Sequence, residues 1–506
     1  MPDDRLPVIV ATGQAVERTD VVGALDLAAR AADTALGSAK ELRDRVDVVS
    51  VVHMLTPAGT APATMLARRL GMEPARTEVS TIGGNSPQTL VTRAARAVAA
   101  GEADVVLVAG AEAQRSMQAR RRAQTGSEAV GSPPARTPCA GDAPAHAPDP
   151  VVGDDRPGMG DAELAAGLVA PVNVYALFES AIAHRAGRSP AEHRAVLGTV
   201  MAPFTRVAAT HPCAWFPEAR SADELATVSA DNRLVSEPYP KRLCAVLGVD
   251  QGAAVLVTSL GTARAAGLAD QAVFVRAGAS VADVWFPSAR PDLGRSPGIA
   301  AAVTAALAAA EVGVDDLDAF DLYSCFPCAV EMAAEAIGVA LDDDRGLSVT
   351  GGLPYFGGPG NNYTLHAIAT MADRLRETGG TGLVTGLGWY ATKHAAGVYS
   401  ATPPPGGFVV ADTAAAQAAI DDSAVPVAAV LDDAPSGSLL AEVVGATIAY
   451  GPGGVPLAAP VIARLEDGRH VAAAAADTDL AALADRDLVG TTVRVWGAQP
   501  RYRVET

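Results

Sequence analysis

The sequence predicts an α/β protein with a duplicated unit and a small β-rich domain appended after it. The order helix, strand, strand, glycine-rich turn, helix, strand occurs in the first third of the chain and again from Pro297 onward. Several strand-like runs, such as Val105–Val108, are continuously apolar, which is typical of strands buried on both faces of a mainly parallel sheet. Beyond the linker Pro403–Gly407, short strand-like runs alternate with tight turns.

The composition limits the class of protein. The chain has 506 residues, enough for three or four structural units, and 49% of them are hydrophobic. A net charge of −18 disfavours nucleic acid as a partner. The most apolar segment, Ile299–Ala310, is too short to cross a bilayer, no signal peptide is visible, and five cysteines do not form a disulfide framework. We therefore expect a cytoplasmic protein with no membrane span.

The first unit is centred on Thr77–Glu112. A strand over Glu78–Ile82 is followed by the turn Gly83–Pro87, a helix over Pro87–Ala100 and a strand over Asp104–Gly110. The two glycines permit a tight turn, and the proline suits the first turn of a helix. Such a turn places one residue at a helix N-terminus, where backbone N–H groups favour negative charge. The turn is therefore a good position for a nucleophile.

The other elements of the first half surround this stretch. Before it, we predict strands over Val8–Ala11 and Val46–Val52 and helices over Val22–Leu36 and Ala63–Leu70. After it, Arg115–Gly160 is an aperiodic excursion that is too long for a plain connection, and is therefore either functional or partly disordered. Two helices, an extended loop and two strands are then predicted over Val172–Arg185, Pro190–Ala208, Asp231–Leu243, Asp250–Leu260 and Ala272–Ser280.

The second unit repeats the first, and a β-rich tail follows it. The predicted helix, strand, strand with glycine turn, helix and strand cover Pro297–Glu311, Asp318–Tyr323, Leu347–Asn362, Tyr363–Glu377 and Gly382–Leu387. Two such units would bring both glycine turns to one cleft beyond the strand ends. The strands predicted in the tail, which indicate a small barrel, are Leu439–Tyr450, Val455–Leu465, Arg469–Ala474, Thr491–Trp496 and Tyr502–Val504, with a helix over Asp477–Ala484.

Several segments together resemble the thiolase superfamily, most nearly the branch similar to sterol-carrier-protein-2 (SCP2) thiolases. They are GGNSP…GEADVVLVAGAEA, NRLVSEPYPKRLC, VDQGAAVLVTS, DLYSCF, TGGLPYFGGPGNN and GLVTGLGWY, spread over roughly Pro7 to Ser400. The resemblance implies a duplicated thiolase fold with a five-layered αβαβα core, an inserted loop domain and a tunnel for coenzyme A (CoA). The extra domain is similar to one found in mycobacterial-type thiolase-like proteins (type 1), often named acetyl-CoA acetyltransferases, and more loosely to the OB-like barrels that accompany some thiolase-fold lyases.

The resemblance also implies a division into domains. An N-terminal thiolase domain covers residues 1–115 and 243–270, and a loop domain that binds CoA covers 116–242. A C-terminal thiolase domain covers 271–402, and a linker with the extra β-rich domain covers 403–506.

The catalytic positions of a thiolase are all substituted in this chain. The nucleophilic cysteine of the family falls on Gly84, the histidine of its Gly-His-Pro motif falls on Gly358, and Tyr323 replaces an asparagine or histidine. The second cysteine falls on Leu387 or on Gly386. Glycine cannot be acylated, and loss of one oxyanion donor alone costs about 3–4 kcal/mol of transition-state stabilisation. Thiolysis and Claisen condensation by the family mechanism are therefore not expected.

Two tyrosines are candidates for different chemistry. Tyr323 occupies a family catalytic position, and Tyr355 lies three residues before Gly358. Some thiolase-fold aldol lyases that act on CoA thioesters of sterol side chains have tyrosines in this region, so the resemblance suggests an acid/base role for both. The alternative is that both are core tyrosines with satisfied hydroxyl groups.

Polar and basic residues are the candidate ligand contacts. In the glycine turns, where amides could contact a thioester carbonyl, they are Asn85, Ser86, Asn361 and Asn362. In the segment that matches the loop domain they are Arg120, Arg121, Arg122, Lys241 and Arg242. These basic residues either hold the phosphates of CoA, for which arginine is geometrically suited, or form a solvated charged face.

Other polar groups are interpreted as structural. Cys325-Phe326-Pro327-Cys328 is a CxxC without a second pair, and we interpret it as two buried thiols rather than a zinc site. A lone histidine on a helix, such as His366, is more often structural, and Lys393 and His394 follow the last predicted core strand. No metal and no covalently bound cofactor is predicted, and CoA or an acyl-CoA is the expected ligand.

Three functions are consistent with these observations. The first is a thiolase-like protein that binds CoA or an acyl-CoA in lipid metabolism without the usual thiolase chemistry. The second is a retro-aldol lyase that acts on an acyl-CoA with tyrosines. The third is a noncatalytic scaffold whose β-rich domain contacts a protein partner. Family members usually dimerise through the strand before the nucleophile, and the sequence leaves monomer and dimer both open.

Overall fold

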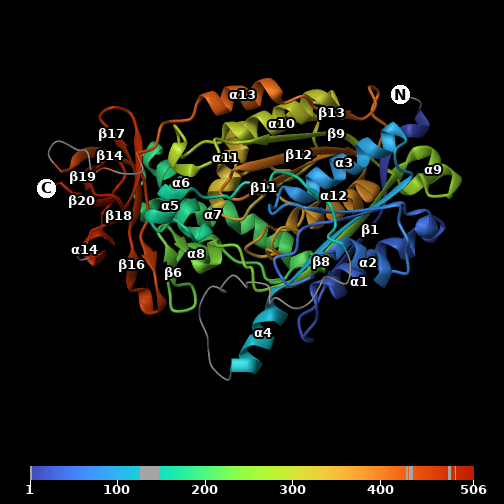
Figure 1. Ribbon diagram of the computed structural model, residues 1–506, viewed down its shortest axis with the longest axis horizontal. Coiled ribbons are helices and arrows are strands. Elements are labelled where there is room, and N and C mark those ends of the chain that lie inside the picture. The colour runs from blue at the N-terminus through green and yellow to red at the C-terminus, as the bar shows by residue number, and fades with distance from the viewer. Residues whose placement is uncertain are drawn as a thin grey trace.

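A long mixed sheet carries the duplication in two halves (Figure 1). The computed structural model describes residues 3–125, 147–428, 431, 437–476, 480–484 and 486–505. The N-terminal half has the order β3-β2-β4-β8-β1, with bounds Arg76–Ser80, Val48–Val51, Val105–Ala113, Asp250–Ser259 and Pro7–Val16. The C-terminal half repeats it as β10-β11-β12-β9, with bounds Ala319–Asp321, Thr381–Gly388, Lys393–Ser400 and Val273–Ala282. The two halves meet where β1 pairs with β9, which confirms the duplicated α/β architecture.

The prediction of a strand at the start of Leu347–Asn362 is wrong. Residues 347–350 form no strand, and Asp321 explains this local structure. Its buried carboxylate accepts hydrogen bonds from the Ser348 hydroxyl at 2.9 Å and from the backbone of Val349 and Thr350 at 3.0 and 3.2 Å. The segment therefore folds around a carboxylate rather than pairing as the counterpart of β3.

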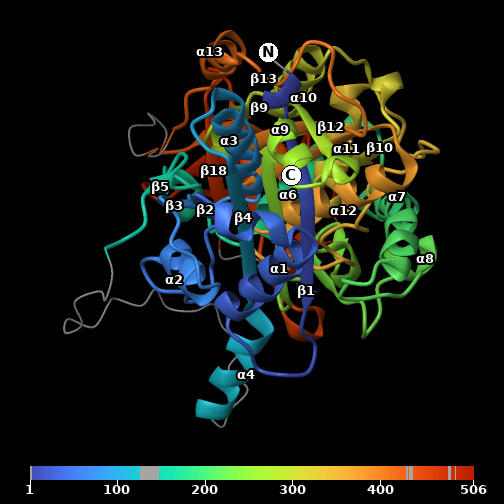
Figure 2. The same ribbon diagram turned by 90° about the vertical axis from the view of Figure 1, so that its right-hand side faces the viewer.

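Helices form three layers around the two halves of the sheet (Figures 1 and 2). The central layer contains α3 (Ser86–Ala100) and α12 (Tyr363–Thr378), which touch strands of both halves. The outer faces are covered by α1 (Ala24–Ser38) with α2 (Pro62–Arg69), and by α10 (Pro297–Ala310) with α11 (Pro327–Ile337) beside it. This arrangement is the predicted five-layered core. Neither α11 nor β12 was predicted from the sequence.

Glycines in the sheet let the central helix approach closely. A Cβ on Gly397 of β12 would fall 2.5 Å from the side-chain carbon of Gln88, which lies on α3. The Gln88 amide oxygen in turn accepts a hydrogen bond at 2.7 Å from Tyr399, also on β12. The C-terminal end of α3 is closed by Gly101, whose φ of 74° is the left-handed conformation that glycine adopts freely.

The chain between β4 and β8 forms an insertion. Its elements are α4 (Gln114–Thr125), β5 (Val151–Val152), α5 (Asp161–Ala165), α6 (Pro171–Arg185), α7 (Pro190–Thr210), α8 (Ala222–Ala226), β6 (Leu234–Ser236) and β7 (Tyr239–Pro240). The predicted aperiodic excursion includes residues 126–146, which lie outside the described residues. On either side of them, α4 projects from the body (Figure 1) and β5 pairs in parallel with β3, so that this edge of the sheet is occupied within the chain.

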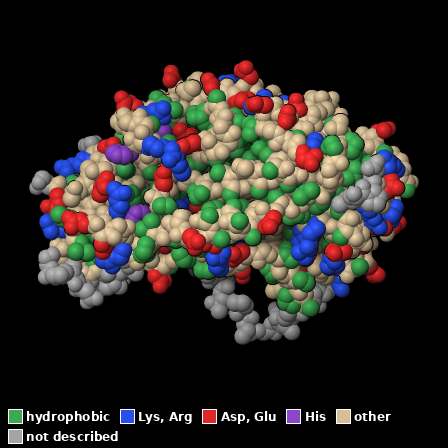
Figure 3. Space-filling view, turned by 90° about the horizontal axis from the view of Figure 1, so that it is seen from above, with side chains coloured by type: hydrophobic (Ala, Val, Ile, Leu, Met, Phe, Trp, Pro, Cys, Tyr) green, Lys and Arg blue, Asp and Glu red, His purple; other side chains and the backbone are tan. Residues whose placement is uncertain are grey.

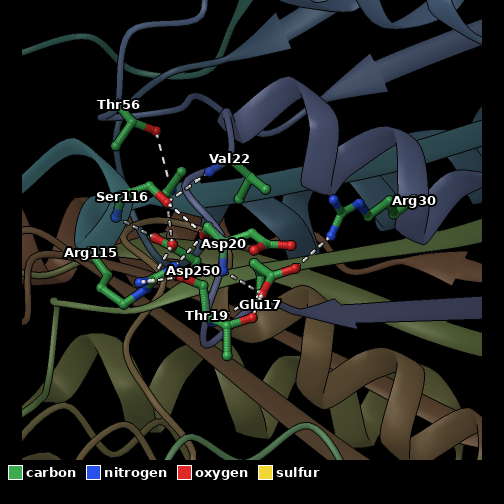
Figure 4. A network of polar contacts seen from close by, with 10 residues as sticks. Glu17, Thr19, Asp20, Val22, Arg30, Thr56, Arg115, Ser116 and Asp250 are labelled. Carbon is green, nitrogen blue, oxygen red and sulfur yellow. Dashed lines mark hydrogen bonds and ion pairs between the residues drawn. The ribbon is translucent and has the colours of Figure 1, made fainter. Parts of the chain in front are cut away.

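A buried polar network joins the two ends of the insertion (Figure 4). Asp250, where the chain returns into β8, accepts hydrogen bonds from the Ser116 hydroxyl at 2.6 Å and from Arg115 Nε at 3.1 Å, where the chain has just left β4. The Ser116 hydroxyl oxygen also accepts from the backbone N–H of Val22 at 2.9 Å. In the same loop, hydrogen bonds from Thr19 and Asp20 and the Arg30 guanidinium hold the pKa of Glu17 at about 2.

The tail contains the predicted barrel. It is closed in the order β14-β17-β18-β20-β19, with bounds Leu439–Ala446, Pro460–Leu465, His470–Ala475, Arg501–Val504 and Thr492–Trp496. The single strand predicted over Val455–Leu465 is divided, because β16 (Pro456–Ala458) leaves the barrel to pair with β15 (Ala449–Tyr450), which itself pairs with β6 of the insertion. Of the predicted helix Asp477–Ala484, the described part is α14 (Leu480–Ala484).

The barrel packs against the insertion at one end of the molecule (Figure 1). The Thr447 hydroxyl donates to the Glu237 carbonyl at 2.8 Å and lies 2.8 Å from the Ser236 hydroxyl. Gly445 lies against Leu177 of α6, where a Cβ would be 3.4 Å from the leucine side chain. The remaining helices α9 (Leu260–Ala265) and α13 (Ala414–Asp422), and β13 (Val409–Val410), lie outside the barrel.

Charged side chains of both signs lie on the surface. Seen from above, the face that carries α10 and α13 shows acidic and basic side chains scattered among hydrophobic ones (Figure 3). None of the described helices is long and apolar enough to cross a bilayer.

Candidate functional site

The two glycine turns meet at the centre of the molecule. We call Gly83–Ser86 the first turn and Gly357–Asn362 the second turn. Asn361 of the second turn accepts a hydrogen bond from the Gly83 N–H at 2.9 Å, and Thr364, at the start of α12, donates one to the Gly84 carbonyl at 2.6 Å. The prediction that both turns come together is confirmed.

Tyr323 occupies the space beside Gly84. A Cβ at Gly84 would lie 2.7 Å from Cζ of Tyr323 and closer still to the hydroxyl oxygen, and 2.5 Å from the Leu387 carbonyl oxygen. These distances are shorter than van der Waals contact, so no side chain fits at position 84 while Tyr323 stays in place. A residue far away in sequence therefore fills the position where the resemblance placed a cysteine.

The Tyr323 side chain is buried among aromatic rings. It is 7% exposed, its ring lies edge-on to Tyr363 with centroids 5.5 Å apart, and burial raises its pKa well above 10. The cavity that borders it, together with Leu387 and His394, has a volume of about 10 Å³, which is enough for one water molecule. The hydroxyl therefore stays protonated near neutral pH and can donate a hydrogen bond.

Tyr355 does not share this cavity. It is 4% exposed, its hydroxyl has no hydrogen-bond partner among the residues that the structure describes, and burial raises its pKa. Its backbone carbonyl accepts from Phe216 N–H at 3.0 Å, so residues of the insertion cover it. Of the two candidate catalytic tyrosines, the structure brings Tyr323 to the first turn and leaves Tyr355 apart from it.

Gly358 and Leu387 differ from Gly84 in their surroundings. A Cβ at Gly358 would meet nothing nearer than the Val246 carbonyl oxygen at 3.3 Å, and Gly358 N–H donates to that oxygen at 2.9 Å. The segment 244–248 therefore lies over the second turn. Leu387 lies in β11 opposite His394, and its own carbonyl faces Gly84.

The asparagines of the second turn bind protein groups. The Asn361 amide donates to the His53 carbonyl and the Asn362 amide donates to the Gly110 carbonyl, both at 2.8 Å. In the part of the chain that the structure describes, the side-chain amide oxygen of Asn362, Oδ1, is buried and has no hydrogen-bond partner. In the described structure these side chains fasten the second turn to the first half of the chain.

A polar cavity lies on the other side of the first turn. It has a volume of about 320 Å³, and Asn85, Ser86, Arg156, Trp285 and Lys393 are among its lining residues. The side-chain amide oxygen of Asn85, Oδ1, is buried and has no hydrogen-bond partner among the described residues. The lining also includes Asp154 and Asp421, and Asp154 pairs with the Arg156 guanidinium at 2.7 Å, so the acidic side chains balance the two basic ones. The N–H groups at the start of α3 are what favours an anionic or carbonyl oxygen here.

Lys393 is the buried basic group of this cavity. It is 6% exposed, donates hydrogen bonds to the carbonyls of Ile82 and Asp154, and has a pKa lowered by burial. The Arg156 guanidinium stacks on the Trp285 ring with 3.6 Å to the centroid. The cavity can therefore accommodate an anionic or carbonyl-bearing group. From the sequence, Lys393 was predicted to follow a core strand and was not assigned to a site.

The other basic candidates lie elsewhere. Arg120, Arg121 and Arg122 are exposed on the projecting helix α4. Lys241 is exposed, whereas Arg242 donates to the Glu224 carbonyl at 3.1 Å. Residues 241–243 lead into segment 244–248, and Gln118 of α4 approaches Gly248 of that segment. These basic candidates do not line the 320 Å³ cavity.

A buried carboxylate beneath the second turn was missed by the sequence analysis. Glu112, at the end of β4, accepts hydrogen bonds from the backbone of Leu55 at 2.5 Å and from the Thr56 hydroxyl at 2.9 Å. A Cβ at Gly360 would lie 2.6 Å from its carboxylate oxygen. Burial raises the pKa of Glu112 to about 7. Its position within an apolar strand run carries no sequence signal of this contact.

The five-layered core, with two glycine turns meeting at its centre, defines a protein with the thiolase fold. No family model matches the chain, and no curated protein sequence matches it. Among solved structures, it is similar to the monomeric SCP2-thiolase-like protein type 1 from Mycobacterium smegmatis, with 32% identity over 100% of both chains and a TM-score of 0.83. The chain belongs to the SCP2-thiolase-like family.

Two more distant structures agree in fold alone. An Ltp2-ChsH2(DUF35) aldolase has 18% identity and a TM-score of 0.60, over 79% of this chain and 98% of that chain. The acetyl-CoA acetyltransferase from Syntrophomonas wolfei has 17% identity and a TM-score of 0.54, over 78% of this chain and 99% of that one. The predicted thiolase fold and family are confirmed by the similarity over the whole length of the M. smegmatis chain.

Proposed function

We propose that this protein binds CoA or an acyl-CoA and does not carry out thiolysis or Claisen condensation through a cysteine. One observation carries the proposal. The Tyr323 side chain fills the space beside Gly84, so the position that would hold the nucleophile has neither a thiol nor room for one. The acyl-CoA-related function of the fold is retained in this proposal, and covalent catalysis is not.

The 320 Å³ cavity supports binding of a thioester. Lys393 Nζ and the start of α3 offer donors to a carbonyl oxygen or an anion, and Arg156 borders the same space. The cavity volume suits the acyl or pantetheine end of the ligand rather than the whole of CoA. The phosphates would then be held outside it, by Arg156 or by the arginines of α4.

Calorimetric titration of the full-length protein with CoA and acetyl-CoA tests the proposal. We expect a dissociation constant in the micromolar range, which corresponds to about −8 kcal/mol. Lys393→Met should weaken binding, with Lys40→Met as the control, since Lys40 is exposed on a short 3-10 helix away from both turns. No thiolysis of acetoacetyl-CoA is expected. No binding at millimolar ligand would overturn the proposal and favour a noncatalytic scaffold.

The location of the phosphates can be assigned with two further variants. If α4 holds them, replacing Arg120, Arg121 and Arg122 together by alanine weakens CoA binding but leaves binding of a short pantetheine thioester unchanged. If the phosphates lie beside the cavity, Arg156→Ala weakens CoA binding instead and leaves binding of the short pantetheine thioester unchanged.

A second candidate function is a retro-aldol lyase. The position of the Tyr323 hydroxyl, directed at the first turn, favours it, and one of the fold neighbours is named as an aldolase. Because burial raises the pKa of Tyr323 well above 10, the hydroxyl would act as an acid or hydrogen-bond donor and not as a base. Cleavage of a 3-hydroxyacyl-CoA that is lost in Tyr323→Phe and kept in Tyr355→Phe would establish this function.

A further inference from the structure

Three buried side chains meet where the insertion packs against the C-terminal half of the core. Glu179 lies on α6, His193 on α7 and Glu331 on α11. Their exposed fractions are 0%, 0% and 8%. The group is separate from both glycine turns and from the 320 Å³ cavity, and no residue of it enters the function proposed above.

The ligand atoms of the three side chains converge on one point. His193 Nε2 lies 2.6 Å from Oε1 of Glu179 and 3.8 Å from Oε2 of Glu331. One ligand atom from each residue lies within 4.8 Å of the others. Imidazole nitrogen and carboxylate oxygen bind zinc at about 2.0–2.2 Å, so ligand atoms around one ion lie roughly 3–3.5 Å apart. Small side-chain rotations bring this set to that spacing.

An unpaired oxygen points to a missing partner. Within the described part of the chain, Oε2 of Glu331 is buried and has no hydrogen-bond donor, although it faces His193 and the carboxyl group of Glu179. A buried carboxylate without a partner is strongly unfavourable, and two adjacent carboxylates make it worse. Either a proton or a cation must neutralise this buried negative charge. In the absence of a cation, burial raises the pKa of both Glu179 and Glu331.

The surrounding groups suit a cation. The Tyr239 hydroxyl donates to Oε2 of Glu179 at 2.6 Å, which orients that carboxylate and leaves Oε1 directed at His193. Cys328, the second residue of α11, lies beside Glu179 and Tyr239, and burial raises the pKa of its thiol, so the ligand set is the three side chains above. Arg188 lies 3.4 Å from His193 Nδ1 and must turn away when Nε2 binds a metal, and it borders a 40 Å³ cavity that gives it room.

We propose that Glu179, His193 and Glu331 form a binding site for a divalent transition-metal ion, with Zn²⁺ the best match to one imidazole and two carboxylates. The site is structural, because it is closed and lies between three packed helices. Its ion would hold the inserted helices α6 and α7 to α11, and would thereby also steady the barrel, which packs on α6. Sequence spacing gave no sign of it, because Glu331 lies on a helix distant in the chain.

The test uses the full-length protein depleted of metal with a chelator and then titrated with Zn²⁺. We expect one equivalent to bind with a dissociation constant of about 1 μM or tighter, and Mg²⁺ not to compete. Glu331→Gln should weaken Zn²⁺ binding by at least about 100-fold, more than loss of an outer-shell partner does. The control is Glu335→Gln on the same helix, whose side chain is 41% exposed and paired with Arg185 and Arg295.

Two outcomes would overturn the proposal. One is no saturable Zn²⁺ binding by the wild-type protein. The other is equal affinity in wild type and Glu331→Gln, which would identify the cluster as carboxyl groups sharing a proton. Should Glu331→Gln fail to fold, Co²⁺ added to the wild-type protein decides the question. Visible absorption bands that one equivalent of Zn²⁺ abolishes support the site, and their absence refutes it.

Discussion

The two glycine turns stand in corresponding places of the duplicated unit, yet their glycines are required for different reasons. In the first turn, Gly84 is fixed by a side chain from the other half, because Tyr323 fills the space that a Cβ would need. In the second turn, Gly358 has no such neighbour, and the turn is held instead by Asn361, Asn362 and the buried Glu112 beneath it. Gly84 and Gly358 both replace a catalytic residue of the family, but their surroundings differ. Packing excludes a larger side chain at position 84, whereas position 358 has room for one.

The largest expected effect comes from restoring a thiol at the first turn. Gly84→Cys should destabilise the protein by about 3 kcal/mol or more, because the new Cβ meets the Tyr323 ring and the Leu387 carbonyl, and a backbone oxygen cannot move aside cheaply. Urea unfolding measures this. Gly37→Ala is the control, since nothing lies within 4 Å of a Cβ there. If Gly84→Cys is as stable as the wild-type protein, the Tyr323 side chain moves aside at little cost. The claim that the first turn is packed more tightly than the second would then be wrong.

An intermediate effect concerns the carboxylate beneath the second turn. The pKa of Glu112 is raised from 4.5 to about 7, so the folded state holds a proton that the unfolded state releases between these values. The stability contributed by the protonated group is fully present below pH 4.5 and is lost as the pH rises through 7. Glu112→Gln mimics the protonated group, so its stability relative to wild type should increase by about 3 kcal/mol from pH 4.5 to 7.5.

Unfolding measured at several pH values tests this expectation. The control is Glu78→Gln at pH 4.5 and 7.5, a carboxylate that is also buried but is paired with the Arg93 guanidinium at 3.1 Å. An unchanged difference between Glu112→Gln and wild type across this range would mean that the second turn rests on an ionised carboxylate at every pH measured.

These contrasts separate what the sequence could predict from what it could not. Element order, periodicity and turn residues predicted the duplicated sheet, the central helices and the barrel, because those signals are local and repeat. The strand at the start of Leu347–Asn362 was predicted wrongly. Residues 348–350 donate hydrogen bonds to the Asp321 carboxylate instead of pairing with a neighbouring strand. These hydrogen bonds depend on a side chain outside the segment, which the local pattern does not indicate.

The candidate site was predictable in its location but not in its detail. Both glycine turns were identified from the sequence pattern and Tyr323 from the resemblance, and the structure places them together. Nothing in the sequence indicates that the Tyr323 hydroxyl lies on Gly84, that Lys393 faces a cavity beside Asn85, or that Glu112 lies beneath Gly360. Each of these contacts joins residues from different strands and turns, and contact between distant residues has no periodic signature.

The smallest effect is expected at Gly358, and it sharpens the comparison most. Gly358→Ala should change stability by less than about 1 kcal/mol, because the new methyl group meets only the Val246 carbonyl oxygen at 3.3 Å and leucine side chains beyond it. Its neighbour is the matched control. Gly357 has a φ of 115° and its Cβ would fall 3.1 Å from the amide carbon of Gln251, so Gly357→Ala should cost several times more.

If Gly358→Ala proves as damaging as Gly357→Ala, the second turn is packed as tightly as the first, and the contrast between the turns is wrong. If it is tolerated, a histidine at 358 becomes a meaningful next substitution. Such a variant would still lack thiolysis, because an imidazole at the second turn has no thiol to activate while Tyr323 occupies the space at Gly84. The absence of thiolase chemistry would then be decided at position 84, where the Tyr323 side chain leaves no room for a cysteine.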